Sequence, residues 1–239
     1  MKLYVYCLAE GIDEWSDSLL GIASAPIRPL KTGNFSLLVS DFAGDAVLVN
    51  RENALAHAAV VQSVLNLTTP LPFRFGTLVT QQQLEEYVRA RREALETKLA
   101  SVRDCVEMSV KIIYDPTSTD ASLRDEEARE KPGTAFLSEK RREILGSEAR
   151  TAEAKQVAAW LETKLAELVK ETRLNANPTN KMVLAAAHLV TRETVEQYRA
   201  RLNEAQHERP ELHFLVSGPW APYSFANIDL EFKTHFGVS

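Results

Sequence analysis

Residues Glu211 to Phe225 read ELHFLVSGPWAPYSF, and the rest of the fold is organised around this stretch. Apolar and polar residues alternate from Leu212 to Ser217, the pattern of a half-buried strand. We expect the strand to stop at Gly218-Pro219, because proline lacks a backbone donor and fixes φ. A second proline, Pro222, follows closely. The segment therefore predicts a stiff, non-repetitive turn.

Three aromatic side chains lie on this predicted turn, at Trp220, Tyr223 and Phe225. One interpretation, favoured by the residue types, is that Trp220 and Phe225 close the end of a core. The other is that the turn presents a recognition surface, since Trp and Tyr are enriched at interfaces. The candidate interaction residues of this turn are Pro219, Trp220, Pro222, Tyr223 and Phe225.

The composition is that of a soluble globular protein. Of 239 residues, 45% are hydrophobic and 26% charged, and the net charge of −5 comes from interleaved acids and bases. With no basic stripe, we expect no nucleic-acid partner. The longest apolar run, Met182 to Val190, is too short to span a lipid membrane. Cys7 and Cys105 are expected to be buried free thiols in a reducing cytosol, so the predicted location is cytoplasmic.

The first half of the chain begins with strand patterns and continues into a helix. Strands are predicted at Lys2–Ala9, Leu19–Ala23, Phe35–Val39 and Asp45–Val49, the last two as a hairpin, with a loop around Pro26 and Pro29. Asn50 is the expected N-cap of a helix over Arg51–Leu65. Its predicted apolar stripe is Leu55, Ala58, Val61 and Leu65, with Val60 and Val64 beside it. His57 would lie at the edge of that stripe as a hydrogen-bonded boundary residue.

A second unusual stretch is TPLPFRFGTLVT, from Thr69 to Thr80. Phe73-Arg74-Phe75 reads as short extended structure with Arg74 facing opposite to both aromatic rings. Arg74 and Phe75 are therefore added to the candidate interaction residues. Two roles for Arg74 remain open: it binds a carboxylate or a partner, or it forms an internal salt bridge.

The second half alternates helix and strand patterns. Helices are predicted at Gln81–Val102, opened by a Thr80/Gln83 capping box, and at Thr134–Leu174, where Gly146 bends or splits the helix. A third helix is predicted to end at Glu208, with Thr191 or Thr194 as its N-cap. Strands are predicted at Cys105–Tyr114 and Lys181–Val190, and the second of these is central because it is apolar on both faces. The polar segment Asp115–Pro132 is expected to be a mobile loop.

The order of these elements predicts an α+β fold with two domains. A strand-rich α+β domain would occupy residues 1–103. The pattern strand, long helix, strand, helix, strand would place residues 104–239 in a modified ferredoxin-like domain that lacks one strand.

Motifs for catalysis are missing from the sequence. It contains no phosphate-binding glycine loop, nucleophile elbow, HExxH or CxxC motif, so we expect no cofactor and no metal, and no enzyme. The alternative is a small-molecule-binding ferredoxin-like protein, or an enzyme that uses Arg74 and His57. A deep polar pocket joining those two residues would favour this alternative, whereas a shallow apolar surface around Trp220 would favour a binding protein.

Four segments together resemble the gas vesicle protein family GvpF/GvpL. They are the strand with Tyr4-Val5-Tyr6, the helix with His57 leading to PLPFRFGT (residues 70–77), KPGTAFL (131–137) and LVSGPWAPYSF (215–225), which is the most specific. The chain departs from the family pattern at Cys7, Ala221 and Phe136, where glycine, proline and tyrosine respectively are commoner.

The resemblance implies a role in building gas vesicles, as an accessory or minor structural protein without enzymatic activity. It also implies contact with the small hydrophobic main shell protein and with other gas vesicle accessory proteins, either in the vesicle wall or on an assembly intermediate. A ferredoxin-like C-terminal domain is implied as well. The resemblance covers GvpF and GvpL alike.

Overall fold

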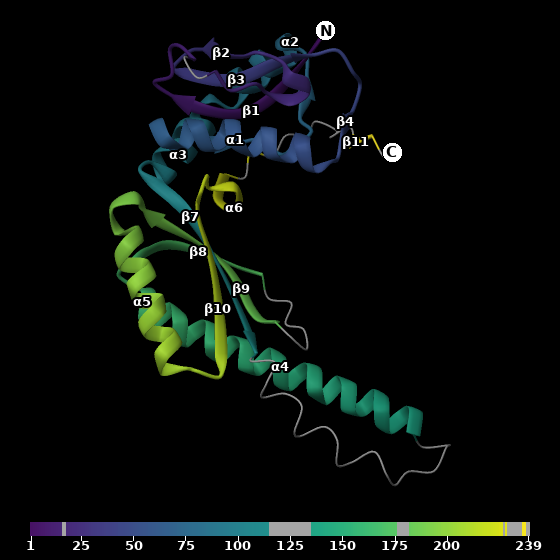
Figure 1. The fold of residues 1–239 in the computed structure, drawn as a ribbon, viewed down its shortest axis with the longest axis vertical. Helices are drawn as coiled ribbons and strands as arrows, with labels where there is room; N and C mark the ends of the chain where they lie inside the picture. The colour runs from purple at the N-terminus through teal and green to yellow at the C-terminus, as the bar shows by residue number, and fades with distance from the viewer. Residues whose placement is uncertain (16–17, 115–134, 176–181, 227, 229–235, 238–239) are drawn as a thin grey trace. The chain divides into compact units, whose positions relative to one another are not determined.

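The computed structural model describes residues 1–15, 18–114, 135–175, 182–226, 228 and 236–237 of an α+β chain (Figure 1). The chain divides into two units, one made of residues 1–107 and 219–239 and the other of residues 108–218. The chain passes between them within strands β7 (Cys105–Tyr114) and β10 (Leu212–Trp220). The predicted boundary at Arg103 stays a prediction, and the last twenty-one residues group with the N-terminal unit instead of the C-terminal one.

Strand β1 (Lys2–Glu10) is the centre of the first unit. Its sheet has the order β2-β3-β1-β5, with β6 (Leu78–Val79) also pairing with β1. β3 (Phe35–Phe42) runs antiparallel to β1 on one side, and the short β5 (Leu71–Pro72) lies on the other. Because neighbours flank both edges and α1 (Arg51–Leu67) contacts the strand, the seven residues from Leu3 to Ala9 are all buried.

Two strand predictions in this unit are wrong. The hairpin is formed by β2 (Ile27–Thr32) and β3, while β4 (Val47–Leu48) pairs in parallel with β11 (Phe236–Gly237). Residues 22–24 form a 3-10 turn, η1 (Ile22–Ser24), in place of the predicted second strand. Pro29 suggested a loop, but β2 is an edge strand, where a missing backbone donor can face away from the ladder.

The predicted helix starts of this unit are confirmed. The Asn50 side chain accepts a 2.8 Å hydrogen bond from the Asn53 amide at the start of α1. Thr80 and Gln83 form the reciprocal capping box of α2 (Gln81–Ala90). The single helix predicted over Gln81–Val102 is interrupted at Arg91 (φ −116°, ψ 17°), after which α3 (Arg92–Val102) begins.

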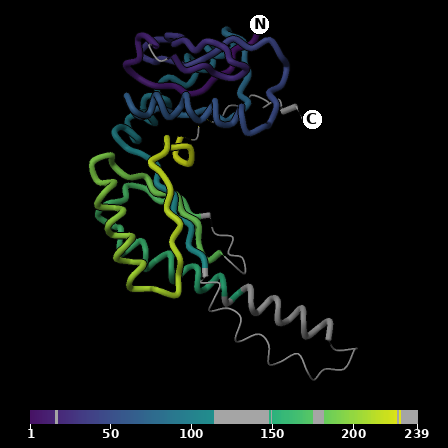
Figure 2. Tube along the Cα trace, viewed as in Figure 1, coloured from purple at the N-terminus to yellow at the C-terminus, as the bar shows by residue number. Residues whose placement is uncertain are grey.

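The second unit has the complete strand order of a ferredoxin-like fold. β7, α4 (Ala135–Leu165), β8 (Val169–Asn175), β9 (Met182–Thr191), α5 (Val195–Glu208) and β10 follow one another, with a short 3-10 turn, η2 (Arg192–Thr194), before α5. The strands lie in the order β10-β7-β9-β8. The neighbouring β7 and β10 can be followed in Figure 2. β9 lies between two neighbours, so its predicted central position is confirmed.

The predicted ferredoxin-like domain lacked one strand, and that strand is β8. The sequence pattern had assigned most of its residues to the long helix. α4 runs without a break through Gly146 but ends at Leu165. VKETRLN then pairs antiparallel with β9. The local sequence suits a helix equally well, and pairing decides the outcome, because the buried β9 would otherwise leave one edge of backbone donors unsatisfied. The predicted loop Asp115–Pro132 lies outside the described residues.

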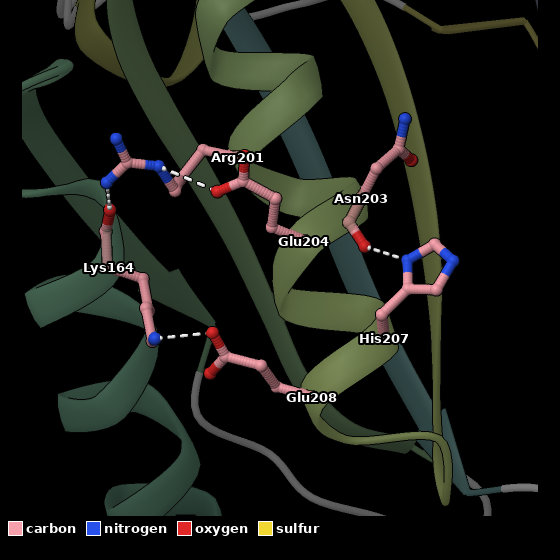
Figure 3. A network of polar contacts seen from close by, with 6 residues as sticks. All are labelled: Lys164, Arg201, Asn203, Glu204, His207 and Glu208. Atoms are coloured by element: carbon pink, nitrogen blue, oxygen red, sulfur yellow. Dashed lines mark hydrogen bonds and ion pairs between the residues drawn. The ribbon is translucent and has the colours of Figure 1, made fainter.

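Helices α4 and α5 pack together and both contact β9, so they cover one face of this sheet. Lys164 at the end of α4 pairs with Glu208 at 2.7 Å, and its carbonyl accepts a bond from Arg201 (Figure 3). Beneath them, His188 of β9 is buried and lies 2.7 Å from the Tyr198 hydroxyl. Burial lowers the pKa of His188 to about 4, so this core histidine is neutral near pH 7.

Candidate functional site

The aromatic segment is more regular than its prolines suggest. β10 continues through Gly218 and Pro219 to Trp220, and a short helix, α6 (Tyr223–Ala226), follows directly after Pro222. Our expectation that the ladder must stop at Gly218-Pro219 is therefore wrong. β10 is an edge strand, which tolerates proline for the same reason as β2. The carbonyl of Pro222 accepts the amides of Phe225 and Ala226, which starts the helical turn.

Burial separates the three aromatic side chains into two roles. Phe225 is 1% exposed and closes the core, together with the buried Ala221 and Pro222. Trp220 is 48% exposed and Tyr223 is 42% exposed. The interpretation of the segment as a core closure therefore holds for Phe225, and it is wrong for Trp220, whose indole reaches the surface of the first unit.

Trp220 and Tyr223 form one side of an apolar groove of about 250 Å³. The other side is α1, which contributes Leu55, Ala58, Ala59, Val61 and Gln62. The helix buries His57, Val60, Val61, Val64 and Leu65, so its buried face is rotated from the predicted stripe. Leu55, expected inside, is 57% exposed. This rotation exposes Leu55 and Ala58, which the sequence pattern placed in the core. Both residues line the groove.

Glu107 holds the aromatic segment in place. Its two carboxylate oxygens accept bonds from the Ser224 amide and hydroxyl, each at 2.7 Å. Glu107 is 8% exposed, on β7, and 117 residues away from Ser224. In the sequence it is one polar residue in an alternating strand, so no local signal identifies its partner. Charge-assisted bonds of this kind are stronger than neutral ones and fix the first turn of α6.

We expect Glu107→Gln to lower the free energy of unfolding by about 1–3 kcal/mol, because the amide keeps one acceptor and loses the charge. Denaturant unfolding measures this, with the exposed Glu93→Gln on α3 as the control, which should change stability little. A Glu107→Gln protein as stable as the control variant would show that the clamp does not stabilise α6.

Beneath the groove lies a cluster of aromatic rings and hydroxyls. The Tyr4 hydroxyl accepts a bond from the Gly76 amide and lies 2.8 Å from His57 Nδ1. The His57 ring contacts Phe75 at 5.9 Å and Tyr223 at 6.4 Å between ring centroids. His57 is therefore hydrogen-bonded, as predicted, but it is fully inside the core instead of at its boundary. Burial lowers the pKa of His57 to about 4, with a partly opposing contribution from the Phe73 backbone.

Tyr223 has two different sides. Its ring is partly exposed in the groove, while burial raises the pKa of its hydroxyl above the usual value, with further contributions from Cys7 and Glu107. The ring also lies beside the buried His57, with 6.4 Å between the ring centroids, so only part of the ring is available to a partner. Removing the whole Tyr223 side chain would therefore disturb the core as well as the groove.

Arg74 and Phe75 lie in a turn that precedes β6. The Arg74 carbonyl accepts bonds from the Thr77 amide and hydroxyl, and Gly76 has φ +83°, a value that favours glycine. Phe75 is half-buried beside His57, whereas Arg74 is exposed and forms no salt bridge within the described part of the chain. No hydrogen bond or ring contact joins Arg74 to His57. The two residues of the enzyme alternative are therefore in different environments, one solvated and one enclosed.

The described residues show neither a metal site nor a membrane helix. No three His, Cys, Asp or Glu side chains among them gather closely enough to hold a metal ion. None of the helices, as far as they are described, is both long and apolar enough to cross a bilayer. What this first unit does present is an apolar groove with one firmly held aromatic wall, which suits the binding of an apolar partner surface.

Comparisons with known proteins point to one family. The sequence matches the family model described as gas vesicle synthesis protein GvpL/GvpF over residues 2–227. It is 27% identical to gas vesicle protein L of Streptomyces sp. (strain CB03234), over 94% of this chain and 92% of that protein. It is 24% identical to gas vesicle protein F1 of Halobacterium salinarum, over 96% and 94% respectively.

Two crystal structures share the fold. The gas vesicle protein GvpF from Anabaena sp. PCC7120 superposes with a TM-score of 0.79 at 21% identity, covering 96% of this chain and 99% of that chain. GvpF from Microcystis aeruginosa superposes with a TM-score of 0.71 at 22% identity, covering 95% and 99%. At these identities the likeness concerns the fold alone.

Proposed function

Because the chain belongs to the GvpL/GvpF family of gas vesicle synthesis proteins, we propose that it binds the main hydrophobic shell protein while the gas vesicle is assembled. In this role it is a non-enzymatic assembly or minor structural protein, acting in the cytoplasm or at the vesicle wall beside other gas vesicle accessory proteins. A small hydrophobic subunit needs such a partner, since exposed apolar surface aggregates before it is packed.

The observation that carries the proposal is the groove between α1 and the segment from Trp220 to Tyr223. Nearly all of its lining atoms are apolar, and Leu55 and Trp220 each leave about half of their side chain exposed. An aromatic wall and an aliphatic wall facing one another suit an apolar side chain or helix face of a partner.

The groove is also preorganised. Glu107 fixes α6 through Ser224, and Phe225 anchors the same turn in the core. Trp220 and Tyr223 therefore lose little conformational freedom when a partner binds, which leaves more of the contact energy for affinity. Arg74, solvated on its turn, and the half-buried Phe75 are proposed as secondary contacts of the same partner.

We expect Trp220→Ala to weaken binding to the shell protein by tenfold or more, as the loss of an interface tryptophan commonly costs about 2 kcal/mol. Leu55→Ser, on the opposite wall, should weaken binding as well. The matched control is Leu67→Ser, on the same helix, 71% exposed and outside the groove. Co-precipitation with the shell protein, after a thermal-unfolding check that each variant is folded, measures the effect.

Equal capture of the shell protein by Trp220→Ala, Leu55→Ser and Leu67→Ser would remove the groove from the interface. Loss of binding in the control Leu67→Ser would indicate a general loss of structure in α1, which the unfolding data would reveal.

A further inference from the structure

The groove between α1 and the segment from Trp220 to Tyr223 offers a partner few backbone hydrogen-bonding groups. On one side, α1 bonds its amides and carbonyls within the helix. On the other side, Pro219 and Pro222 carry no backbone N–H. The carbonyls of Ala221 and Pro222 already accept amides of the turn that forms α6. These two walls therefore lack the row of open amides and carbonyls that a pairing strand requires.

This shortage decides which conformation of a partner segment suits the groove. An extended segment would bury its own N–H and C=O groups against the side chains of Leu55, Ala58 and Trp220, which have no polar group to accept or donate at that surface. Buried backbone groups without a partner are costly. A helix satisfies these groups internally and presents only side chains. The groove therefore favours a helix with one apolar face.

The α1 wall also has the spacing on which a second helix packs. Leu55, Ala58, Ala59 and Gln62 lie at positions i, i+3, i+4 and i+7, so they form one stripe along about two turns of α1. The two alanines in the middle of the stripe allow another helix to approach closely. Leu55 and Trp220, each about half exposed, stand on either side of that approach. Two turns of a partner helix would fit apolar side chains between them.

Arg51 gives one end of this stripe a charge. Its position on α1 aligns with Ala58 and Gln62, along the middle of the stripe, whereas Glu52 aligns with Ala59 at the border. Arg51 is exposed and forms no ion pair with another residue of the described part of the chain. It also lies in the first turn of α1, where the helix dipole is positive. An acidic side chain of the partner is complementary to this end of the groove.

We propose that the groove binds one face of an amphipathic helix of the shell protein. The helix places apolar side chains spaced i, i+3 or i+4, and i+7 against the stripe of α1 and under Trp220. One turn beyond them, an acidic side chain pairs with Arg51. This inference rests on the proposed function, and it adds the conformation and the charge pattern of the contacting segment.

Two synthetic peptides of identical composition test the conformation. One carries leucines at helical spacing, with a glutamate one turn beyond them at either end, and the other carries the same residues in the strict alternation of a strand. Fluorescence anisotropy of the labelled peptides measures their binding to the full chain. The helical peptide should bind about tenfold more tightly or better, and Leu55→Ser should weaken its binding about tenfold. Leu67→Ser, outside the groove, should leave it unchanged.

Alternating and helical peptides that bind equally well would overturn the proposal. So would binding of neither peptide, or binding of the helical peptide that Leu55→Ser and Leu67→Ser leave equally strong.

A charge exchange tests the role of Arg51. Arg51→Glu should weaken binding of the helical peptide about fivefold, and a peptide with lysine in place of the glutamates should bind this variant better than it binds wild type. Arg89→Glu makes the same change of charge at an exposed position of α2 outside the groove. If Arg89→Glu and Arg51→Glu weakened binding equally, the effect would come from net charge, and the pairing with Arg51 would be wrong.

Capture of the shell protein separates this inference from the proposed function. If Trp220→Ala abolished capture while the two peptides bound alike, the groove would be the binding site and the helical partner would be wrong. If the helical peptide bound in the groove while Trp220→Ala captured the shell protein normally, the groove would select a helix that the shell protein does not supply, and the proposed function would be wrong.

Discussion

Phe225→Ala should lower the free energy of unfolding by about 3–5 kcal/mol, the usual cost of removing a large aromatic side chain from a core. Phe225 is 1% exposed and lies in the helical turn that Glu107 clamps. The substitution would leave a cavity and also loosen the turn. Thermal or denaturant unfolding of the full chain measures the loss.

Trp220→Ala is the matched comparison, five residues earlier on the same segment. Because its indole is 48% exposed, we expect this change to cost only about 1 kcal/mol of stability. The two variants therefore distinguish a residue that packs in the core from one that contacts a partner: we expect Phe225 to govern stability and Trp220 to govern binding. If Trp220→Ala destabilised the protein as much as Phe225→Ala, the tryptophan would be part of the core after all, and the groove would lose its exposed wall.

Local signals in the sequence identified most helix starts. The Asn50 cap, the Thr80/Gln83 capping box and the doubly apolar β9 strand were all predictable, because each depends on neighbouring residues. β8 was not predictable in this way. VKETRLN has no strong preference for strand over helix, and its pairing with β9 decides its conformation.

The groove shows the same division between local and long-range information. The sequence singled out Trp220 and Tyr223 as residue types suited to an interface, but it could not show which of the three aromatic side chains is buried. That depends on Glu107, 117 residues from its partner Ser224, and on a rotation of α1 that turns Leu55 outward. An amphipathic pattern does not fix the rotation of a helix to within one residue. His57 is an example: it was predicted at the boundary of the core, but it is a core residue bonded to Tyr4.

Acid is expected to destabilise the protein between pH 6.5 and 4 through His57 and His188, the two buried histidines in the described part of the chain. Burial lowers the pKa of His57 and of His188 from 6.5 to about 4. Between these two pH values, the unfolded chain therefore binds more protons than the folded chain. The stabilisation is fully present above pH 6.5, and it is lost as the pH falls toward 4. Each histidine should account for about 3 kcal/mol of this loss.

Variants that cannot take up the proton isolate this contribution. Asparagine offers a side-chain acceptor near the position of Nδ1, so His57→Asn keeps a partner for Tyr4, and His188→Asn keeps one for Tyr198. Both variants should be less stable than wild type at pH 7.5, because the packing of the ring is lost. Their stability should nevertheless fall less steeply with acid, so that the gap to wild type narrows by pH 4.5. His207→Asn, at an exposed position on α5, should follow the wild-type curve. A constant gap between wild type and His57→Asn across this range would mean that the folded protein accommodates the charged imidazole, and the core around Tyr4 would then have to be open to water.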